Sequence, residues 1–134
     1  MNYEKLIKKH EGIRLKPYKD TEGILTIGVG RNLEDNGISE DEANYLLNND
    51  IKHSIADVRS VIPEFDGLPE NVKLVLVDMM FNLGINRFRL FKKMIAAVKS
   101  NNWPEMIAEM KDSKWCRELT SRCEDNAALI KAII

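Results

Sequence analysis

The chain has 134 residues, of which 44% are hydrophobic and 31% are charged, and this composition is typical of one soluble globular domain. Its net charge of −1 argues against a general nucleic-acid-binding protein. No apolar run is long enough to span a bilayer, and the first residues show no signal-peptide pattern. We therefore expect no membrane insertion and synthesis in the cytoplasm.

The charges are distributed unevenly along the chain. Residues 1–84 contain 10 basic and 15 acidic side chains, whereas residues 85–134 contain 10 basic and 6 acidic ones. A basic C-terminal part could favour an anionic polymer such as the bacterial cell wall. Scattered charge that only confers solubility explains the same counts equally well.

The two cysteines, Cys116 and Cys123, lie seven residues apart. With only two histidines in the chain, they do not form a zinc-ligand pattern, and we expect no metal site. Cys123 falls on the apolar side of a predicted helix, so we expect a buried free thiol.

In residues 2–30 the spacing of the apolar residues changes from one typical of a helix to one typical of a strand. Asn2 is a good cap for a helix that continues through Glu11 and stops at Gly12. Residues 24–27 are β-branched and apolar and are flanked by glycine, which predicts a short strand of a hairpin.

This stretch contains three side chains suited to one reaction. Glu11 lies at the end of the predicted helix, where the partial negative charge favours a protonated carboxyl group. Asp20 lies in a predicted turn, where water keeps it ionised, and Thr26 provides a hydroxyl on the strand. Two carboxyl groups in such different surroundings are typical of glycoside hydrolysis.

A long helix follows a polar loop at residues 32–37. Ser39 and Glu42 form a capping-box pattern, and an apolar stripe predicts a helix to about Val61. Such a helix spans about 35 Å, too long for a small lobe, so we expect it to link two lobes behind a cleft. We predict an ion pair between Arg31 and Asp50 that ties the hairpin to this helix, although two unpaired surface charges fit equally well.

The remainder of the chain is predicted to be helical. Residues 70–83 have almost no polar face, which predicts a helix at the centre of the second lobe. Asp78 and Asn82 interrupt this pattern, and we expect Asp78 to bond to loop backbone. Further elements are predicted as a helix over 88–98, a short helix from Pro104, an irregular stretch from Ser113, and a last helix opened by a capping box of Ser121 and Glu124.

The motifs Glu-Gly-x-Arg-Leu, Tyr-x-Asp-x-x-Gly and Thr-Ile-Gly-x-Gly follow one another in this order within residues 11–30. With Phe-Asn-Leu-Gly at 81–84, Trp103, Ser-Lys-Trp at 113–115 and Arg122, the chain resembles the T-even phage lysozymes, glycoside hydrolase family 24, over nearly its whole length. The resemblance implies an α+β lysozyme-like fold. It implies a hairpin-containing lobe at about 13–40, a linking helix at about 39–62, and a helical lobe of about 1–12 and 63–134.

The resemblance also implies roles for individual residues. Glu11, Asp20 and Thr26 would be catalytic, whereas the implied substrate-binding residues are Asn32, Phe81, Asn82 and Arg122. Phe81 would contact sugar, and Arg122 would pair with Glu11, an arrangement that opposes the effect of the helix end. The chain departs from the family at several positions, which are Arg31, Asn32, Met94 and Glu109.

The implied activity is hydrolysis of bacterial peptidoglycan with inversion, which needs no metal or organic cofactor. We expect a monomer that accumulates in the host bacterial cytoplasm and reaches the wall with the help of a separate holin. Two other classes stay open at this point. One is a wall-binding module without activity, and the other is a helical protein-interaction or nucleic-acid-binding domain, whose binding to nucleic acid would depend steeply on salt.

Overall fold

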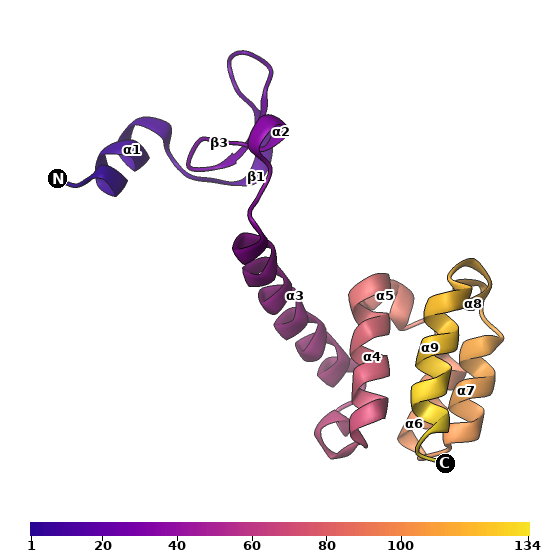
Figure 1. Cartoon of the computed structure of the whole chain (residues 1–134). Coiled ribbons are helices and arrows are strands. Elements are labelled where there is room, and N and C mark those ends of the chain that lie inside the picture. The colour runs from indigo at the N-terminus through magenta and orange to yellow at the C-terminus, as the bar shows by residue number, and fades with distance from the viewer. The chain divides into compact units, whose positions relative to one another are not determined.

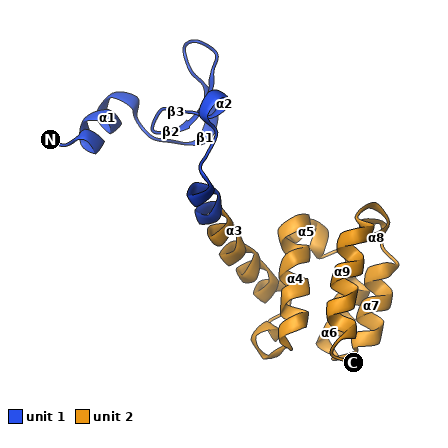
Figure 2. Cartoon of the chain, viewed as in Figure 1, with its two compact units in different colours: residues 1–46 blue, residues 47–134 orange.

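The computed structural model describes all 134 residues, which form two compact units, Met1–Leu46 and Leu47–Ile134 (Figure 2). Helices predominate, and one three-stranded sheet lies in the first unit (Figure 1). The predicted α+β class is confirmed. None of the helices combines the length and the apolar composition that crossing a bilayer requires.

Unit 1 begins with the predicted N-terminal helix, α1 (Tyr3–Glu11). The Asn2 side chain accepts a hydrogen bond from the Lys5 amide at 2.8 Å and so caps the helix. Gly12 ends it at a φ of 73°, in the left-handed region that glycine adopts most easily. Glu11 is therefore the last residue of a helix, as predicted.

The sheet of unit 1 consists of three antiparallel strands in the order β1-β2-β3: Arg14–Lys19, Leu25–Gly28 and Arg31–Asn32. The central strand β2 contains residues 25–27 of the predicted strand, while Ile24 precedes it. Its Thr26 pairs with Tyr18 on one side and Asn32 on the other. The register of β1 shifts between Arg14 and Tyr18. Pro17 lies in that segment, and proline cannot donate a ladder hydrogen bond.

The loop predicted at residues 32–37 is instead a short helix, α2 (Leu33–Asn36). Asn32 caps it by accepting a hydrogen bond from the Asp35 amide at 2.9 Å. The long helix that follows, α3 (Glu40–Val61), ends where it was predicted to end. Its capping box is also confirmed: the Glu42 amide donates to Ser39 Oγ, and the Ser39 amide donates to Glu42 Oε1.

Unit 2 contains the C-terminal part of α3 and a compact group of helices around one hydrophobic core. These are a 3-10 turn η1 (Phe65–Gly67), α4 (Glu70–Leu83), α5 (Ile85–Phe88), α6 (Lys92–Lys99), α7 (Trp103–Lys111), α8 (Lys114–Glu118) and α9 (Thr120–Lys131). Helix α4 provides more buried side chains than any other element, which are Val72, Val75, Leu76, Met79, Met80 and Leu83. The prediction that this helix is central to the helical part is confirmed.

Three details of unit 2 differ from the predictions. The helix expected over 88–98 is divided into α5 and α6 by residues 89–91. The stretch from Ser113 is helical, because the Ser113 side chain accepts a hydrogen bond from the Cys116 amide and caps α8. Ser121 caps nothing, because α9 already begins at Thr120 and Ser121 lies in its first turn.

The prediction of a free buried thiol is wrong, because Cys116 and Cys123 form a disulfide. Residue 116 lies in α8 and residue 123 in α9, and their Cα atoms are 5.1 Å apart. Both cysteines are buried in the core of unit 2. The sequence placed Cys123 on the apolar face correctly, but it did not show that the turn between the two helices brings Cys116 beside it.

Reduction of this disulfide should lower the free energy of unfolding by about 2 kcal/mol, because the cross-link restricts the unfolded chain over only a short loop. Chemical unfolding of the protein with and without dithiothreitol measures this difference. A Cys116→Ala/Cys123→Ala variant is the matched control and should not respond to the reductant. Equal stability of the oxidised and reduced wild-type protein would contradict the prediction.

Candidate functional site

Asp20 lies in the turn that joins β1 to β2. Its Oδ1 accepts hydrogen bonds from the amides of Glu22, at 2.8 Å, and Ile24, at 2.9 Å. The backbone of the turn closes around it, since the Asp20 amide donates to the Ile24 carbonyl. Because the turn itself holds Oδ1, the Asp20 carboxylate is fixed in place, and Oδ2 accepts no hydrogen bond within the chain.

Thr26 lies in the middle of the sheet and is only 4% exposed. Its Oγ1 donates a hydrogen bond to the Ile24 carbonyl at 2.8 Å. That bond uses the hydroxyl proton, so the oxygen can act toward any further partner only as an acceptor. Since Ile24 also donates its amide to Asp20, one residue of the turn orients both polar side chains.

Glu11 lies against the turn that joins β2 to β3. A Cβ atom added at Gly30 would lie 2.7 Å from Glu11 Oε2 and 2.9 Å from its Cδ, closer than real Cβ contacts. The Glu11 carboxyl group therefore lies over the bare Cα of Gly30. Asp20 and Glu11 thus lie at the two opposite ends of β2, with Thr26 on the strand between them.

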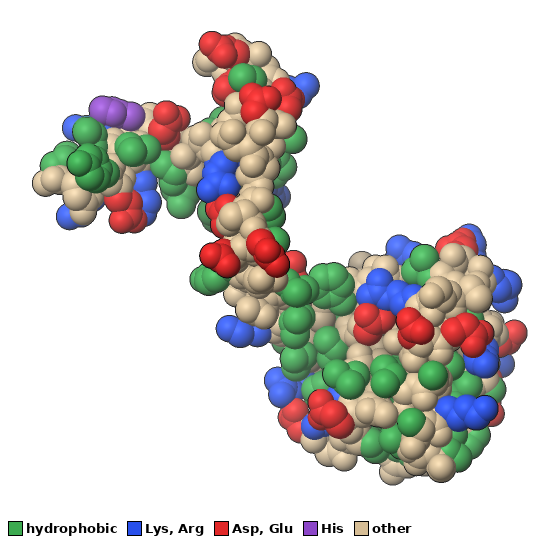
Figure 3. Space-filling model, in the orientation of Figure 1, with side chains coloured by type: hydrophobic (Ala, Val, Ile, Leu, Met, Phe, Trp, Pro, Cys, Tyr) green, Lys and Arg blue, Asp and Glu red, His purple; other side chains and the backbone are tan.

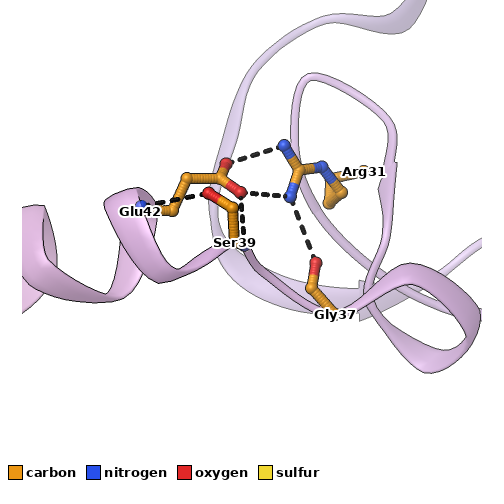
Figure 4. A network of polar contacts seen from close by, with 4 residues as sticks. All are labelled: Arg31, Gly37, Ser39 and Glu42. Carbon is orange, nitrogen blue, oxygen red and sulfur yellow. Dashed lines mark hydrogen bonds and ion pairs between the residues drawn. The ribbon is translucent and has the colours of Figure 1, made fainter.

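Arg31 binds Glu42 and not Asp50, which corrects the predicted pair. The guanidinium donates to both Glu42 carboxylate oxygens, at 2.9 and 2.7 Å, and also to the Gly37 carbonyl (Figure 4). The reason is the capping box, which already holds the Glu42 carboxylate at the start of α3, whereas Asp50 follows about 12 Å farther along the helix. The hydrogen bond from Arg31 is the main cause that lowers the pKa of Glu42 to about 2.

Unit 2 contains a groove of about 610 Å³ between α3 and α4. Phe81, which is 43% exposed, and Arg122 both line it, together with apolar side chains of α3 such as Ile51 and Ile55. Figure 3 shows hydrophobic side chains gathered where α3 and α4 meet. The structure therefore brings two of the four predicted substrate-binding residues together.

Arg122 is held by an acidic side chain of the same unit, Asp78. Its Nε and Nη2 donate to the two Asp78 carboxylate oxygens at 2.9 and 2.7 Å. Asn126, one turn farther along α9, donates to the same carboxylate. Burial raises the pKa of Asp78, but the hydrogen bonds from Arg122 and Asn126 outweigh burial and leave that pKa below its ordinary value. The expectation that Asp78 bonds to loop backbone is wrong.

The other two predicted binding residues have structural contacts of their own. Asn82 accepts a hydrogen bond from the Trp115 indole at 2.8 Å, which connects α4 to α8. The Asn32 side chain caps α2 and also donates to the Asp35 carboxylate. Within unit 2, Asn82 is not among the residues that line the groove of Phe81 and Arg122. Their role in binding stays a prediction.

Known proteins are similar to this chain over most of its length. The sequence pattern of the family described as phage lysozyme matches residues 8–127. The chain belongs to the phage lysozyme family. It is 26% identical to "Probable T4-type lysozyme 2" of Dictyostelium discoideum, over 87% of this chain and 86% of that protein. It is also 26% identical to the pre-baseplate central spike protein Gp5 of Enterobacteria phage T4, over 91% of this chain but 26% of that protein. A SAR-endolysin of Bacteriophage PS119 is 34% identical over 59% of this chain and 48% of that protein.

Membership of the phage lysozyme family confirms the resemblance and, with the helices and sheet described above, the lysozyme-like α+β fold. The matched segment includes Glu11, Asp20 and Thr26. The match covers these positions but assigns them no roles. No group of three or more His, Cys, Asp or Glu side chains is arranged to hold a metal ion.

Three contacts around these residues are not predicted by the sequence. The capping-box pattern gives Glu42 one partner, Ser39, and does not show that the same carboxylate also binds Arg31. The partners of Asp78 could have been found, because Arg122 and Asn126 are four residues apart on one face of α9. Nothing in the sequence except the glycine at position 30 indicates the contact between Glu11 and Gly30.

The Arg31–Glu42 pair gives unit 1 a testable pH dependence. Because the pKa of Glu42 is about 2 in the folded protein and 4.5 ordinarily, its contribution to stability is complete above about pH 4.5 and is lost as pH falls toward 2. Unfolding in urea between pH 7 and pH 2 should therefore show a smaller decline for Glu42→Gln than for the wild-type protein. Glu40→Gln, on the same turn of α3, is the control and should decline like the wild type. Identical pH profiles for all three proteins would refute this role.

Proposed function

We propose that this protein is a lysozyme that hydrolyses the β-1,4 bond between N-acetylmuramic acid and N-acetylglucosamine in bacterial peptidoglycan. The observation that carries the proposal is the arrangement of Glu11, Asp20 and Thr26 along β2 of one small unit, in a chain of the phage lysozyme family. The names of its relatives, which include T4-type lysozymes and a SAR-endolysin, support the same class of substrate.

The position of the two carboxyl groups supports hydrolysis with inversion. Strand β2 has four residues and spans about 10 Å, and Asp20 lies in the turn before it while the Glu11 carboxyl group lies against Gly30 in the turn after it. Inverting glycosidases separate their carboxyl groups by about 6.5–9.5 Å so that a water molecule fits, whereas retaining enzymes need about 5–5.5 Å. An arrangement at two ends of a strand favours the wider spacing.

In this mechanism Glu11 donates its proton to the glycosidic oxygen while the bond from that oxygen to the anomeric carbon breaks. A water molecule attacks the anomeric carbon from the opposite face and loses its proton to Asp20. The ionised Asp20 carboxylate also stabilises the positive charge that develops on the sugar. Thr26 accepts a hydrogen bond from the attacking water. Its hydroxyl proton is already donated to the Ile24 carbonyl, so Oγ1 can act toward the water only as an acceptor.

Further substrate contacts are proposed for residues of unit 2 and of the sheet edge. We propose, from the family resemblance, that Phe81 contacts a sugar ring and that Arg122 pairs with Glu11. The exposed ring of Phe81 and the unused Nη1 of Arg122 are compatible with these roles. Asn32 and Asn82 are proposed as further contacts to substrate. The assignment of residues 1–12 to the helical lobe also stays a prediction.

We propose that the protein acts as a monomer, needs no cofactor, accumulates in the host bacterial cytoplasm and reaches the wall through a separate holin. Action outside the cytoplasm fits the disulfide between Cys116 and Cys123, because reducing compartments keep thiols reduced. Lysis of the host cell would then follow from cutting of the wall.

Substitution of either carboxyl group should abolish hydrolysis without unfolding the protein. Glu11→Gln removes the proton donor, and Asp20→Asn keeps an oxygen for the two turn amides but removes the charge. We expect the release of reducing ends from purified peptidoglycan to fall at least a hundredfold in each variant. Glu22→Gln, in the same turn as Asp20, is the matched control and should retain wild-type activity.

The same assay separates the competing functions. Release of reducing ends without new free amines identifies a glycosidase and excludes an amidase or peptidase. A wall-binding module would bind peptidoglycan in a sedimentation assay and release no product. Equal rates for the wild-type protein, Glu11→Gln and Asp20→Asn would refute the assigned roles.

A further inference from the structure

The contact between Glu11 and Gly30 is unusual among the contacts that the glycines make. A Cβ atom added at Gly30 would lie 2.7 Å from Glu11 Oε2, 2.9 Å from Cδ and 3.2 Å from Cγ. At every other glycine of the chain, an added Cβ would meet nothing within 4 Å. Gly30 is therefore the one glycine whose missing side chain leaves room for another residue, and that residue is Glu11.

We propose that Gly30 is a positioning residue, which sets the place of the Glu11 carboxyl group by leaving open the space above its own Cα. This inference rests on the proposed function of Glu11 as proton donor. Gly30 itself would touch neither substrate nor water. Its effect on the reaction would be exerted entirely through the side chain that lies on it.

The location of Gly30 makes it suitable for this role. It is the second of the two residues that connect β2 to β3, and the next residue, Arg31, is anchored to Glu42. The backbone at residue 30 is thus tied both to the sheet and to α3. Glu11 is exposed at the C-terminal end of α1, and contact with this anchored backbone would restrict where its carboxyl group can lie.

The Glu11 atoms near Gly30 indicate how a substitution of Gly30 would affect the protein. The atoms that a new methyl group would meet belong to the far part of a flexible glutamate side chain, which can rotate away at small cost. Displacement of the carboxyl group should therefore change catalysis much more than stability. A misplacement of about 1 Å can reduce the rate of an enzyme about a hundredfold.

Gly28, the last residue of β2, provides a matched control two residues away. Its φ of +69° is almost that of Gly30, +66°, so an L-residue at either position takes the same unfavourable positive φ. An added Cβ at Gly28 meets nothing within 4 Å. A comparison of Gly30→Ala with Gly28→Ala therefore isolates the contact with Glu11 from the strain of the turn.

The experiment measures kcat, KM and the thermal unfolding midpoint of the wild-type protein, Gly28→Ala and Gly30→Ala on soluble peptidoglycan fragments. We expect both variants to lower the midpoint by a similar amount. We expect Gly30→Ala alone to lower kcat, by about tenfold to a hundredfold, with KM changed less than twofold. Equal kcat values for the two variants would overturn the proposal, because strain in the turn would then explain the whole effect.

Two additions keep the test decisive. If an alanine variant does not fold, Gly28→Asn and Gly30→Asn replace the pair, since asparagine tolerates left-handed backbone better than alanine does. The ¹³C resonance of the Glu11 carboxyl group gives a reading without activity. It should move much farther in the Gly30 variant than in the Gly28 variant, and equal movement would refute the proposal. A wild-type protein without hydrolysis would refute the proposed function, while this resonance would still decide whether Gly30 positions Glu11.

Discussion

The bidentate pair between Arg31 and Glu42 joins the sheet of unit 1 to the start of α3. Only one residue of the first 46, Thr26, is buried within the structure described, so a hydrophobic core does not hold this unit together. Exposed ion pairs usually contribute little, but this one is bidentate and is coupled to the capping box of α3. It fixes the last strand of the sheet to the start of the long helix. The turn that holds Asp20 and the turn on which the Glu11 carboxyl group lies are both parts of that sheet.

Unit 2 is built on the opposite principle. A continuous hydrophobic core runs through α4, α6, α7 and α9, and the polar contacts are few and specific. Two of these contacts join α4 to the C-terminal helices. Asn82 of α4 accepts a hydrogen bond from Trp115 of α8, and Asp78 of α4 accepts hydrogen bonds from Arg122 of α9. The core sets the positions of the helices, and these contacts fix the side chains on their surface. In this way Asp78 holds Arg122 on the wall of the groove that Phe81 also lines.

Local rules predicted the features that are decided within a few residues of the chain. The cap at Asn2, the stop at Gly12, the capping box at the start of α3 and the strand around Thr26 all follow from their neighbours. The contacts that were predicted wrongly join residues whose approach depends on the fold. Arg31 contacts Glu42 because the chain turns at Gly37, and Cys116 contacts Cys123 because the chain turns at Leu119, between α8 and α9. The order of motifs indicated the family correctly, whereas the contact of Glu11 with Gly30 could be found only in three dimensions.

We propose that two carboxyl groups at opposite ends of one short strand cut a glycosidic bond with inversion. The anomeric form of the first product tests it most directly. Proton NMR spectra recorded within minutes of adding enzyme to soluble peptidoglycan fragments distinguish the two anomers before they interconvert. Cleavage of a β bond with inversion releases the α-anomer first, and the account predicts that result. Initial release of the β-anomer would contradict the mechanism.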